Sequence, residues 1–118
     1  VVCVDSGYEV HVGGNGGIKI RGTDLLCKCA TEEEVKEYCG AFMQLYREEG
    51  RYLERTAPWI ERVGLSYVKS RIVEDADNRK ALYGRFLDSQ KHAQVDPWAE
   101  RASGYKDAHE FQALRQVG

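Results

Sequence analysis

The chain has 118 residues, which is enough for one domain and too few for two domains of ordinary size. Hydrophobic residues make up 42% of it and charged residues 31%, as in soluble globular proteins, and no apolar run is long enough to span a membrane. The formal net charge of −2 provides no general attraction for nucleic acid or an anionic membrane, so we expect neither as a partner.

Residues 1–30 show the alternation of apolar and polar side chains that is typical of strands. Val1–Val4 predicts one strand, and because the chain opens directly on this apolar run, we expect a fragment of a longer protein. Tyr8–Val12 and Ile18–Arg21 predict an antiparallel hairpin with one apolar and one polar face. Asp24–Cys29 fits either a further strand or an irregular segment.

Five residues, Gly13–Gly17, form the bend of the predicted hairpin. Its Asn-Gly pair favours a tight turn because both residues tolerate positive φ, but a two-residue turn needs no further glycine. The additional glycines fit two interpretations: a flexible bend, or a backbone that something bulky must approach closely. After the bend, Ile18 and Ile20 are predicted to lie on the apolar face of the hairpin.

The polar face of the predicted hairpin collects His11, Lys19 and Arg21 beside Glu9. Basic side chains next to glycine amides can bind a carboxylate- or phosphate-bearing ligand, but a solvated face with one cross-strand ion pair explains the same pattern. A dinucleotide fingerprint is excluded because these glycines lead into a strand and not into a helix. No nucleophile or orienting carboxylate is discernible near His11, so the pattern does not favour a general base there.

After residue 30 the apolar spacing changes to that of helices. Thr31 and Glu34 form a capping box, which predicts a long amphipathic helix over residues 32–54. Further helices are predicted to begin at Thr56–Pro58 (ending at Gly64), at Ser66, at Asp75 or Asp77, and at Asp96-Pro97.

The order of these elements predicts the α+β class, with an N-terminal antiparallel hairpin or small sheet followed by several packed helices. We assign residues 1–102 to this domain and residues 103–118 to a polar tail or docking segment, because the last stretch is polar and weakly patterned.

Four cysteines, Cys3, Cys27, Cys29 and Cys39, could form two disulfides or one tetrahedral metal site. Only Cys27 and Cys29 are close in sequence, whereas structural zinc usually uses paired C-x2-4-C groups. The spacing therefore favours buried free thiols, as in a cytosolic protein. A small zinc-binding module on the four cysteines is the alternative.

One segment, Tyr8–Gly17, resembles the C-terminal sirohaem and iron–sulfur region of the large subunit of assimilatory NAD(P)H-dependent nitrite reductases. The resemblance covers almost the whole chain in unbroken order. Because several blocks are collinear, it is more specific than a lone glycine-rich loop. The further blocks are Thr31–Val35, Tyr46–Glu48, Tyr52–Trp59, Val73–Asp75 and Asp96–Glu100.

The resemblance implies a part in the multi-electron reduction of nitrite to ammonium. Electrons from NAD(P)H would pass through FAD to a 4Fe-4S cluster and then to sirohaem, whose iron binds nitrite. Related sulfite reductases share the Gly-Gly-Asn block, so Gly13, Gly14 and Asn15 would line the cofactor pocket. Lys19 and Arg21 would be partners for the carboxylates of sirohaem.

This chain also departs from the family pattern. The family holds its cluster on two close groups of cysteines, roughly C-x5-C and C-x3-C, and neither group occurs here. We therefore carry no ligand role to Cys27 or Cys29, assign no catalytic or metal-binding residue, and expect the isolated chain to hold no cofactor and to be inactive.

The expected partners are the remainder of the reductase chain and its small subunit, with nitrite as the substrate of the intact enzyme in the cytoplasm. The flavin and pyridine-nucleotide sites would lie on domains outside this chain. The alternative function is a free-standing, non-catalytic interaction domain with the same fold.

Overall fold

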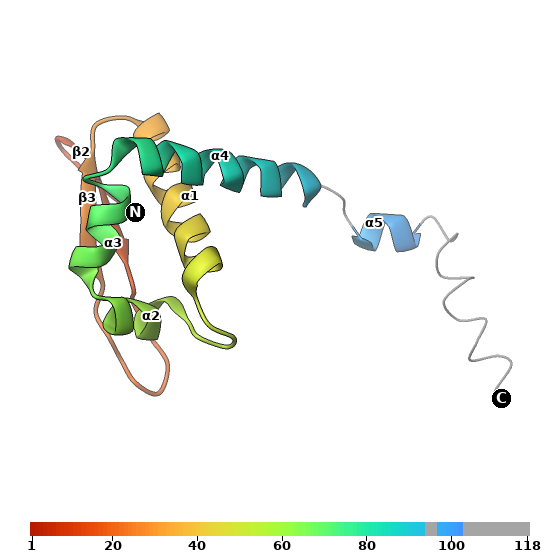
Figure 1. The fold of residues 1–118 in the computed structure, drawn as a ribbon, viewed down its shortest axis with the longest axis horizontal. Coiled ribbons are helices and arrows are strands. Elements are labelled where there is room, and N and C mark those ends of the chain that lie inside the picture. The colour runs from red at the N-terminus through yellow and green to blue at the C-terminus, as the bar shows by residue number, and fades with distance from the viewer. Residues whose placement is uncertain (94–96, 103–118) are drawn as a thin grey trace, which may run out of the picture. The chain divides into compact units, whose positions relative to one another are not determined.

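The computed structural model describes residues 1–93 and 97–102, in which a three-stranded antiparallel sheet is followed by helices (Figure 1). This order confirms the predicted α+β class. The chain divides into two compact units, Val1–Asp88 and Ser89–Gly118. The predicted polar tail, residues 103–118, lies outside the described residues. The sheet has the order β1-β2-β3, with β1 (Val2–Val4), β2 (Gly7–Val12) and β3 (Asp24–Cys29).

β2 forms its second hairpin with β3, so the prediction of a strand at Ile18–Arg21 is wrong. The physical reason is packing, since the side chains of Ile18 and Ile20 are exposed and meet no core. β3 instead contributes the buried side chains of Leu26 and Cys29 to the apolar face of the sheet. The segment between the two strands is therefore a loop whose apolar side chains face outward.

Helix α1 (Glu32–Glu49) begins as predicted but ends before the predicted residue 54. The Thr31 hydroxyl accepts a hydrogen bond from the N–H of Glu34 at 3.3 Å, which confirms the predicted cap. The helix stops because Gly50 is extended, with φ −67° and ψ 150°. Leu53 then takes a left-handed φ of 63° and is exposed.

Two short helices follow, α2 (Thr56–Val63) and α3 (Leu65–Ile72). Gly64 lies between them with φ 88°, which confirms the predicted end of the first helix. The predicted cap at Ser66 is wrong, because α3 has already begun at the preceding residue. A left-handed glycine lets the chain change direction between the helices within a single residue.

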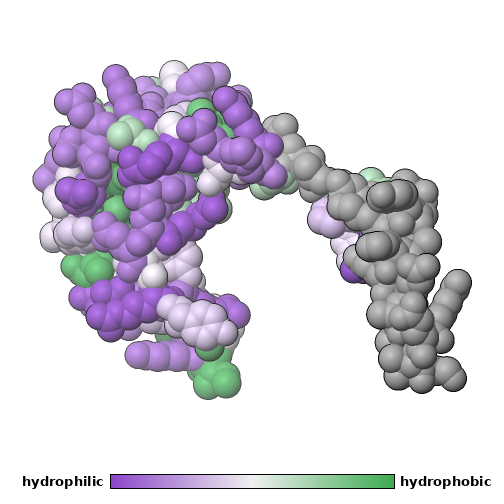
Figure 2. All heavy atoms as spheres, turned by 45° about the vertical axis from the view of Figure 1, so that its right-hand side comes forward, coloured by the Kyte–Doolittle hydropathy of each residue, from purple (hydrophilic) through white to green (hydrophobic). Residues whose placement is uncertain are grey.

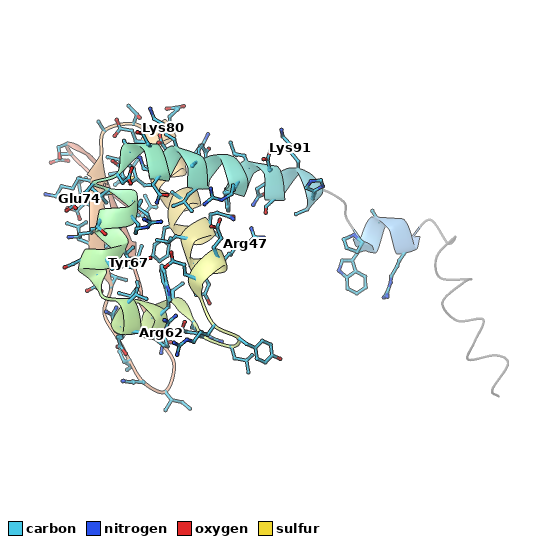
Figure 3. The ribbon with its side chains drawn as sticks, in the orientation of Figure 1. Arg47, Arg62, Tyr67, Glu74, Lys80 and Lys91 are labelled. Atoms are coloured by element: carbon cyan, nitrogen blue, oxygen red, sulfur yellow. The ribbon has the colours of Figure 1, made fainter. Side chains whose placement is uncertain are left out.

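Side chains from α2 and α3 hold the end of α1 and the loop after it (Figure 3). Both Nε and Nη2 of Arg62 donate to the carboxylate of Glu54, each at 2.8 Å. The Tyr67 hydroxyl donates to the carboxylate of Glu49 at 2.7 Å. The Tyr46 hydroxyl donates to the backbone carbonyl of Glu54. The end of α1 and the loop after it are thus held together by side chains from α1, α2 and α3.

Helix α4 (Ala76–His92) begins directly after Asp75, whose carboxylate accepts a hydrogen bond from the N–H of Asn78 at 3.0 Å. This confirms the predicted start. Helix α5 (Pro97–Ala102), in the second unit, begins at the predicted proline. Among residues 1–93 and 97–102, no helix is both long enough and apolar enough to cross a bilayer.

The core centres on Trp59, whose ring is fully buried and packs edge-on against Phe42 and Tyr46 with centroid distances of 5.8 and 5.6 Å. Val10 and Val12 are buried, as predicted for the apolar face of β2. The core brings α2 close to the loop between β2 and β3. The remaining buried apolar side chains are Leu26, Cys29, Ala41, Leu45, Ala57, Ile60, Val68, Ile72 and Leu82.

Candidate functional site

The glycine loop, residues 13–23, connects β2 to β3 and contains every residue predicted to line a site. Asn15 organises its tip through both backbone and side chain. The N–H of Asn15 donates to the carbonyl of Arg21, and the N–H of Arg21 donates back, each at 2.9 Å. The Asn15 amide nitrogen donates to the carbonyl of Lys19 at 2.8 Å, and its amide oxygen accepts from the N–H of Gly17 at 3.3 Å. The tip is therefore a closed loop and not a two-residue turn.

Arg21 binds the base of the glycine loop to its surroundings. Its Nη1 donates to the carbonyl of Gly13 at 2.8 Å, its Nη2 lies 2.7 Å from the carboxylate of Asp24, and its Nε lies 3.1 Å from that of Glu61. The hydrogen bond to Asp24, followed by the charges of both carboxylates, raises the pKa of the guanidinium above its ordinary value. All three donor nitrogens of Arg21 thus have partners within this chain.

Lys19 is the second cation predicted to line the site, and unlike Arg21 it is largely exposed to solvent. Its side chain is 85% exposed, and its only described ion pair is a 4.0 Å approach of Nζ to Glu61. Such an exposed pair constrains a lysine little. Its ammonium group is therefore available to an anion that approaches the glycine loop from outside.

His11 does not join the two cations, although the predicted polar face grouped all three. Its Nε2 lies 3.3 Å from the carboxylate of Glu9 and its Nδ1 lies 3.3 Å from the hydroxyl of Thr23. Both ring nitrogens thus have neighbours on β2 or at the end of the glycine loop.

The glycines of the loop fall into two groups. Gly13 has φ +76°, and a Cβ there would lie 2.7 Å from Cδ1 of Ile60; a Cβ on Gly14 would lie 2.8 Å from the methyl of Thr23. The chain's own packing accounts for both glycines, and the positive φ makes Gly13 the more strictly required. A Cβ on Gly16 or Gly22 would meet nothing within 4 Å, and on Gly17 it would make only an ordinary contact. None of these three has a positive φ, so nothing inside the described chain explains them.

The tip of the glycine loop is also apolar. Ile18 is fully exposed and Ile20 is 83% exposed, although the sequence placed them on the buried face. Figure 2 shows hydrophobic surface at the lower tip of the coloured part, at the height where Figure 1 draws this loop. Sequence reasoning missed these two residues as contact candidates. The signal that could have found them is their position between glycines, which weaken a strand.

The four cysteines are free thiols, as predicted, but Cys3 is exposed and the prediction that it is buried is wrong. It lies on a strand whose whole burial pattern is exposed. Burial raises the pKa of Cys27 to about 12 and also raises those of Cys29 and Cys39. The sulfur atoms of Cys27 and Cys29 lie 3.8 Å apart. In the described part of the chain, no group of three or more His, Cys, Asp or Glu side chains is placed to hold a metal ion.

Residues 1–80 match the family profile described as the nitrite and sulphite reductase 4Fe-4S domain, so the chain belongs to that family. The match includes the three strands, the glycine loop and the first three helices. The resemblance seen in the sequence is thereby confirmed.

Curated relatives carry the same assignment. The NAD(P)H nitrite reductase of Bacillus subtilis is 50% identical over 100 residues, which are 85% of this chain and 12% of that protein. The large subunit of the NADH nitrite reductase of Escherichia coli is 31% identical over 102 residues, again 85% of this chain and 12% of that subunit. This chain therefore spans about one eighth of the length of these relatives. No solved structure matches it.

Proposed function

We propose that this chain is a segment of an NAD(P)H-dependent nitrite reductase and supplies one wall of the sirohaem pocket in which nitrite is reduced to ammonium. The observation that carries the proposal is Gly16, which has open space around its Cα and no positive φ. We infer that this position leaves room for a body outside the chain to approach the backbone of the glycine loop closely.

The remaining residues of the glycine loop fit such a body. Sirohaem is a broad, flat macrocycle with apolar ring faces and many carboxylates. Ile18 and Ile20 offer apolar side chains to its rings, and Lys19 offers an ammonium group to a carboxylate. Gly13, Gly14 and Asn15 give the loop its thin, closed shape.

Arg21 contributes in a different way. We propose that it lines the pocket while it holds the loop in position, because its donors already bind Gly13, Asp24 and Glu61. Its charge still adds to the attraction for an anionic macrocycle.

The thiols of this chain do not suit an iron–sulfur cluster. In the described part of the chain no three or more His, Cys, Asp or Glu side chains are grouped so that they could hold a metal ion, and the sequence lacks the two close cysteine groups on which the family holds its cluster. We propose that the cluster, FAD and NAD(P)H are bound by the rest of the reductase in the cytoplasm, that a small subunit assembles with it, and that the isolated chain is inactive.

The test is a chimera in which this chain replaces the matching segment of the Bacillus subtilis reductase. We expect the chimera to reduce nitrite and to show a sirohaem absorption band, and we expect Lys19→Gln to weaken that band. Lys28→Gln, on β3 outside the glycine loop, is the matched control. A folded chimera without sirohaem would contradict the proposal and would favour the free-standing interaction domain. Stoichiometric sirohaem or iron on the isolated chain would contradict its expected inactivity.

A further inference from the structure

The turn at residues 51–54, between α1 and α2, carries two exposed apolar side chains. The N–H of Glu54 donates to the carbonyl of Arg51 at 3.0 Å, which closes a four-residue turn with Tyr52 and Leu53 at its centre. Tyr52 is 93% exposed and Leu53 is 84% exposed. A positive φ at the third position, here 63° at Leu53, is the type II geometry, in which glycine or asparagine is usual. This turn therefore keeps a leucine where its own backbone favours glycine.

The backbone of the turn is fixed by hydrogen bonds within the chain. The carboxylate of Glu54 accepts from the N–H of Arg51 at 3.1 Å and from two nitrogens of Arg62, each at 2.8 Å. The carbonyl of Glu54 accepts from the Tyr46 hydroxyl. Side chains on a fixed backbone lose less conformational entropy when they bind, so this turn presents its two apolar side chains in a form suited to docking.

The charges around the turn that have no partner are positive. Arg47, Arg51 and Arg55 are exposed, and their side chains make no ion pair or hydrogen bond within residues 1–93 and 97–102. The nearby carboxylates are instead engaged inside the chain, those of Glu48, Glu49, Glu54 and Glu61 by Arg85, Tyr67, Arg62 and Arg21 in that order. A complementary partner would therefore carry acidic as well as apolar groups.

The turn lies at the same end of the first unit as the glycine loop (Figure 1). Neighbouring residues of α2 hold the two segments. Glu61 binds Arg21 of the glycine loop, and Arg62 binds Glu54 of the turn. The four most exposed large apolar side chains of the described residues lie on these two segments, namely Ile18, Ile20, Tyr52 and Leu53. Apolar side chains gathered in this way are typical of an interaction surface.

The position of the turn favours the rest of the reductase polypeptide as its partner. If the glycine loop is one wall of the sirohaem pocket, the opposite wall belongs to the rest of that polypeptide, which then passes beside the turn. This remainder is large, since the matching segment is only 12% of the Bacillus subtilis relative. A second copy of this chain fits less well, because a symmetric contact through the turn would bring the unpaired arginines of both copies together.

We propose that the turn at residues 51–54 docks on an acidic, partly apolar surface of the rest of the reductase polypeptide. Tyr52 and Leu53 are buried in this contact, and Arg51 and Arg55 face carboxylates of the partner surface. The inference rests on the proposed function for the identity of the partner. It adds a protein contact beside the proposed cofactor wall.

The experiment compares the chimera described above with the isolated chain. We expect hydroxyl-radical labelling of Tyr52 to be slower in the chimera, and amide hydrogen exchange at Arg51 and Glu54 to be about tenfold slower. In the chimera, Leu53→Gly should restore much of the labelling of Tyr52, because it removes an apolar contact. The same substitution relieves the left-handed φ of Leu53, so a loss of docking could not be attributed to unfolding.

A second pair of variants tests the acidic character of the partner. In the chimera, Arg51→Gln combined with Arg55→Gln should also restore much of the labelling of Tyr52. The matched control combines Lys36→Gln with Lys80→Gln, which removes the same charge from exposed side chains near the starts of α1 and α4. The control should leave the labelling unchanged. Labelling that stays slow in the double arginine variant would overturn the acidic partner.

The outcomes separate this inference from the proposed function. A chimera that holds sirohaem but labels Tyr52 as fast as the isolated chain would overturn the inference alone. Protection of Tyr52 without sirohaem would support the docking contact and contradict the cofactor role. Protection of Tyr52 in a dimer of the isolated chain, or in the chimera only after the small subunit is added, would show a different occupant and would overturn the inference.

Discussion

The guanidinium of Arg21 donates a hydrogen bond from Nη1 to the backbone carbonyl of Gly13 at 2.8 Å. The sequence analysis grouped Arg21 with basic side chains that can bind an anionic ligand. In the structure its main role is to hold the glycine loop in place. The same side chain reaches Asp24 on β3 and Glu61 on α2. The base of the loop is thus held by one side chain with three separate contacts.

Arg21→Lys should loosen the glycine loop while the fold remains intact. A lysine has one ammonium group and cannot reproduce three donors in a planar fork. We expect amide exchange at Asn15 and Arg21 to accelerate about tenfold and the urea midpoint to fall slightly. Lys19→Gln is the control and should leave both unchanged. Equal exchange rates in the Arg21→Lys variant would show that the loop does not need the guanidinium.

Alanine at two glycines of the loop should give opposite results. Gly13→Ala places a Cβ at φ +76° against Ile60 and Arg21, so we expect a loss of about 1–2 kcal/mol in the free energy of unfolding. Gly16→Ala meets open space at an ordinary φ and should stay within about 0.5 kcal/mol of the parent. Urea unfolding measures both. In the chimera, Gly16→Val should weaken sirohaem binding, and its failure to do so would remove the main support for a close approach.

Replacing Leu53 with glycine should stabilise the chain. Leu53 has φ 63° and is 84% exposed, so its side chain adds strain and little packing. Relief of the left-handed conformation is worth about 1 kcal/mol. Leu53→Ala retains a Cβ and is expected to show no such gain. If thermal or urea unfolding finds both variants equal, the loop does not hold this residue in the left-handed region in solution.

Protonation of the Glu54 carboxylate should contribute to unfolding of the chain in acid. The hydrogen bonds from Arg62 lower the pKa of this carboxyl from 4.5 to about 2. Because the folded pKa lies below the unfolded one, the stabilisation is fully present above about pH 5 and is lost as the pH falls toward 2. Glu54→Gln should therefore have a lower urea midpoint at pH 7 and a shallower fall between about pH 5 and pH 2. Parallel pH profiles for the two proteins would contradict this assignment.

The four thiols should react at very different rates. With a pKa of about 12, Cys27 has roughly one thiolate in ten thousand molecules at pH 8, and the buried Cys29 is protected as well. We expect iodoacetamide to modify the exposed Cys3 at least about a hundredfold faster than Cys27 in the folded chain, as followed by mass spectrometry. Denaturation should make the two rates similar. Rapid labelling of Cys27 in the native chain would mean that it is an accessible thiolate.

Local chemistry determined much of this fold from the sequence alone. The Thr31 cap, the helix end at Gly64 and the start of α4 after Asp75 depend on residues close together in the chain. The apolar face of β2 also followed from its alternation, which burial of Val10 confirms. The family could be identified in the same way, because collinear blocks of residues carried the resemblance.

Only the tertiary structure decided which strand pairs with β2. The local pattern allows a strand at Ile18–Arg21 and at Asp24–Cys29. Only the second segment pairs with β2, because Leu26 is buried in the core whereas Ile18 is exposed to solvent. That choice turned the glycine bend into a closed loop and gave Arg21 its partners on β3 and α2. Burial and long-range ion pairing arise between segments far apart in the chain, so alternation along a single segment could not predict them.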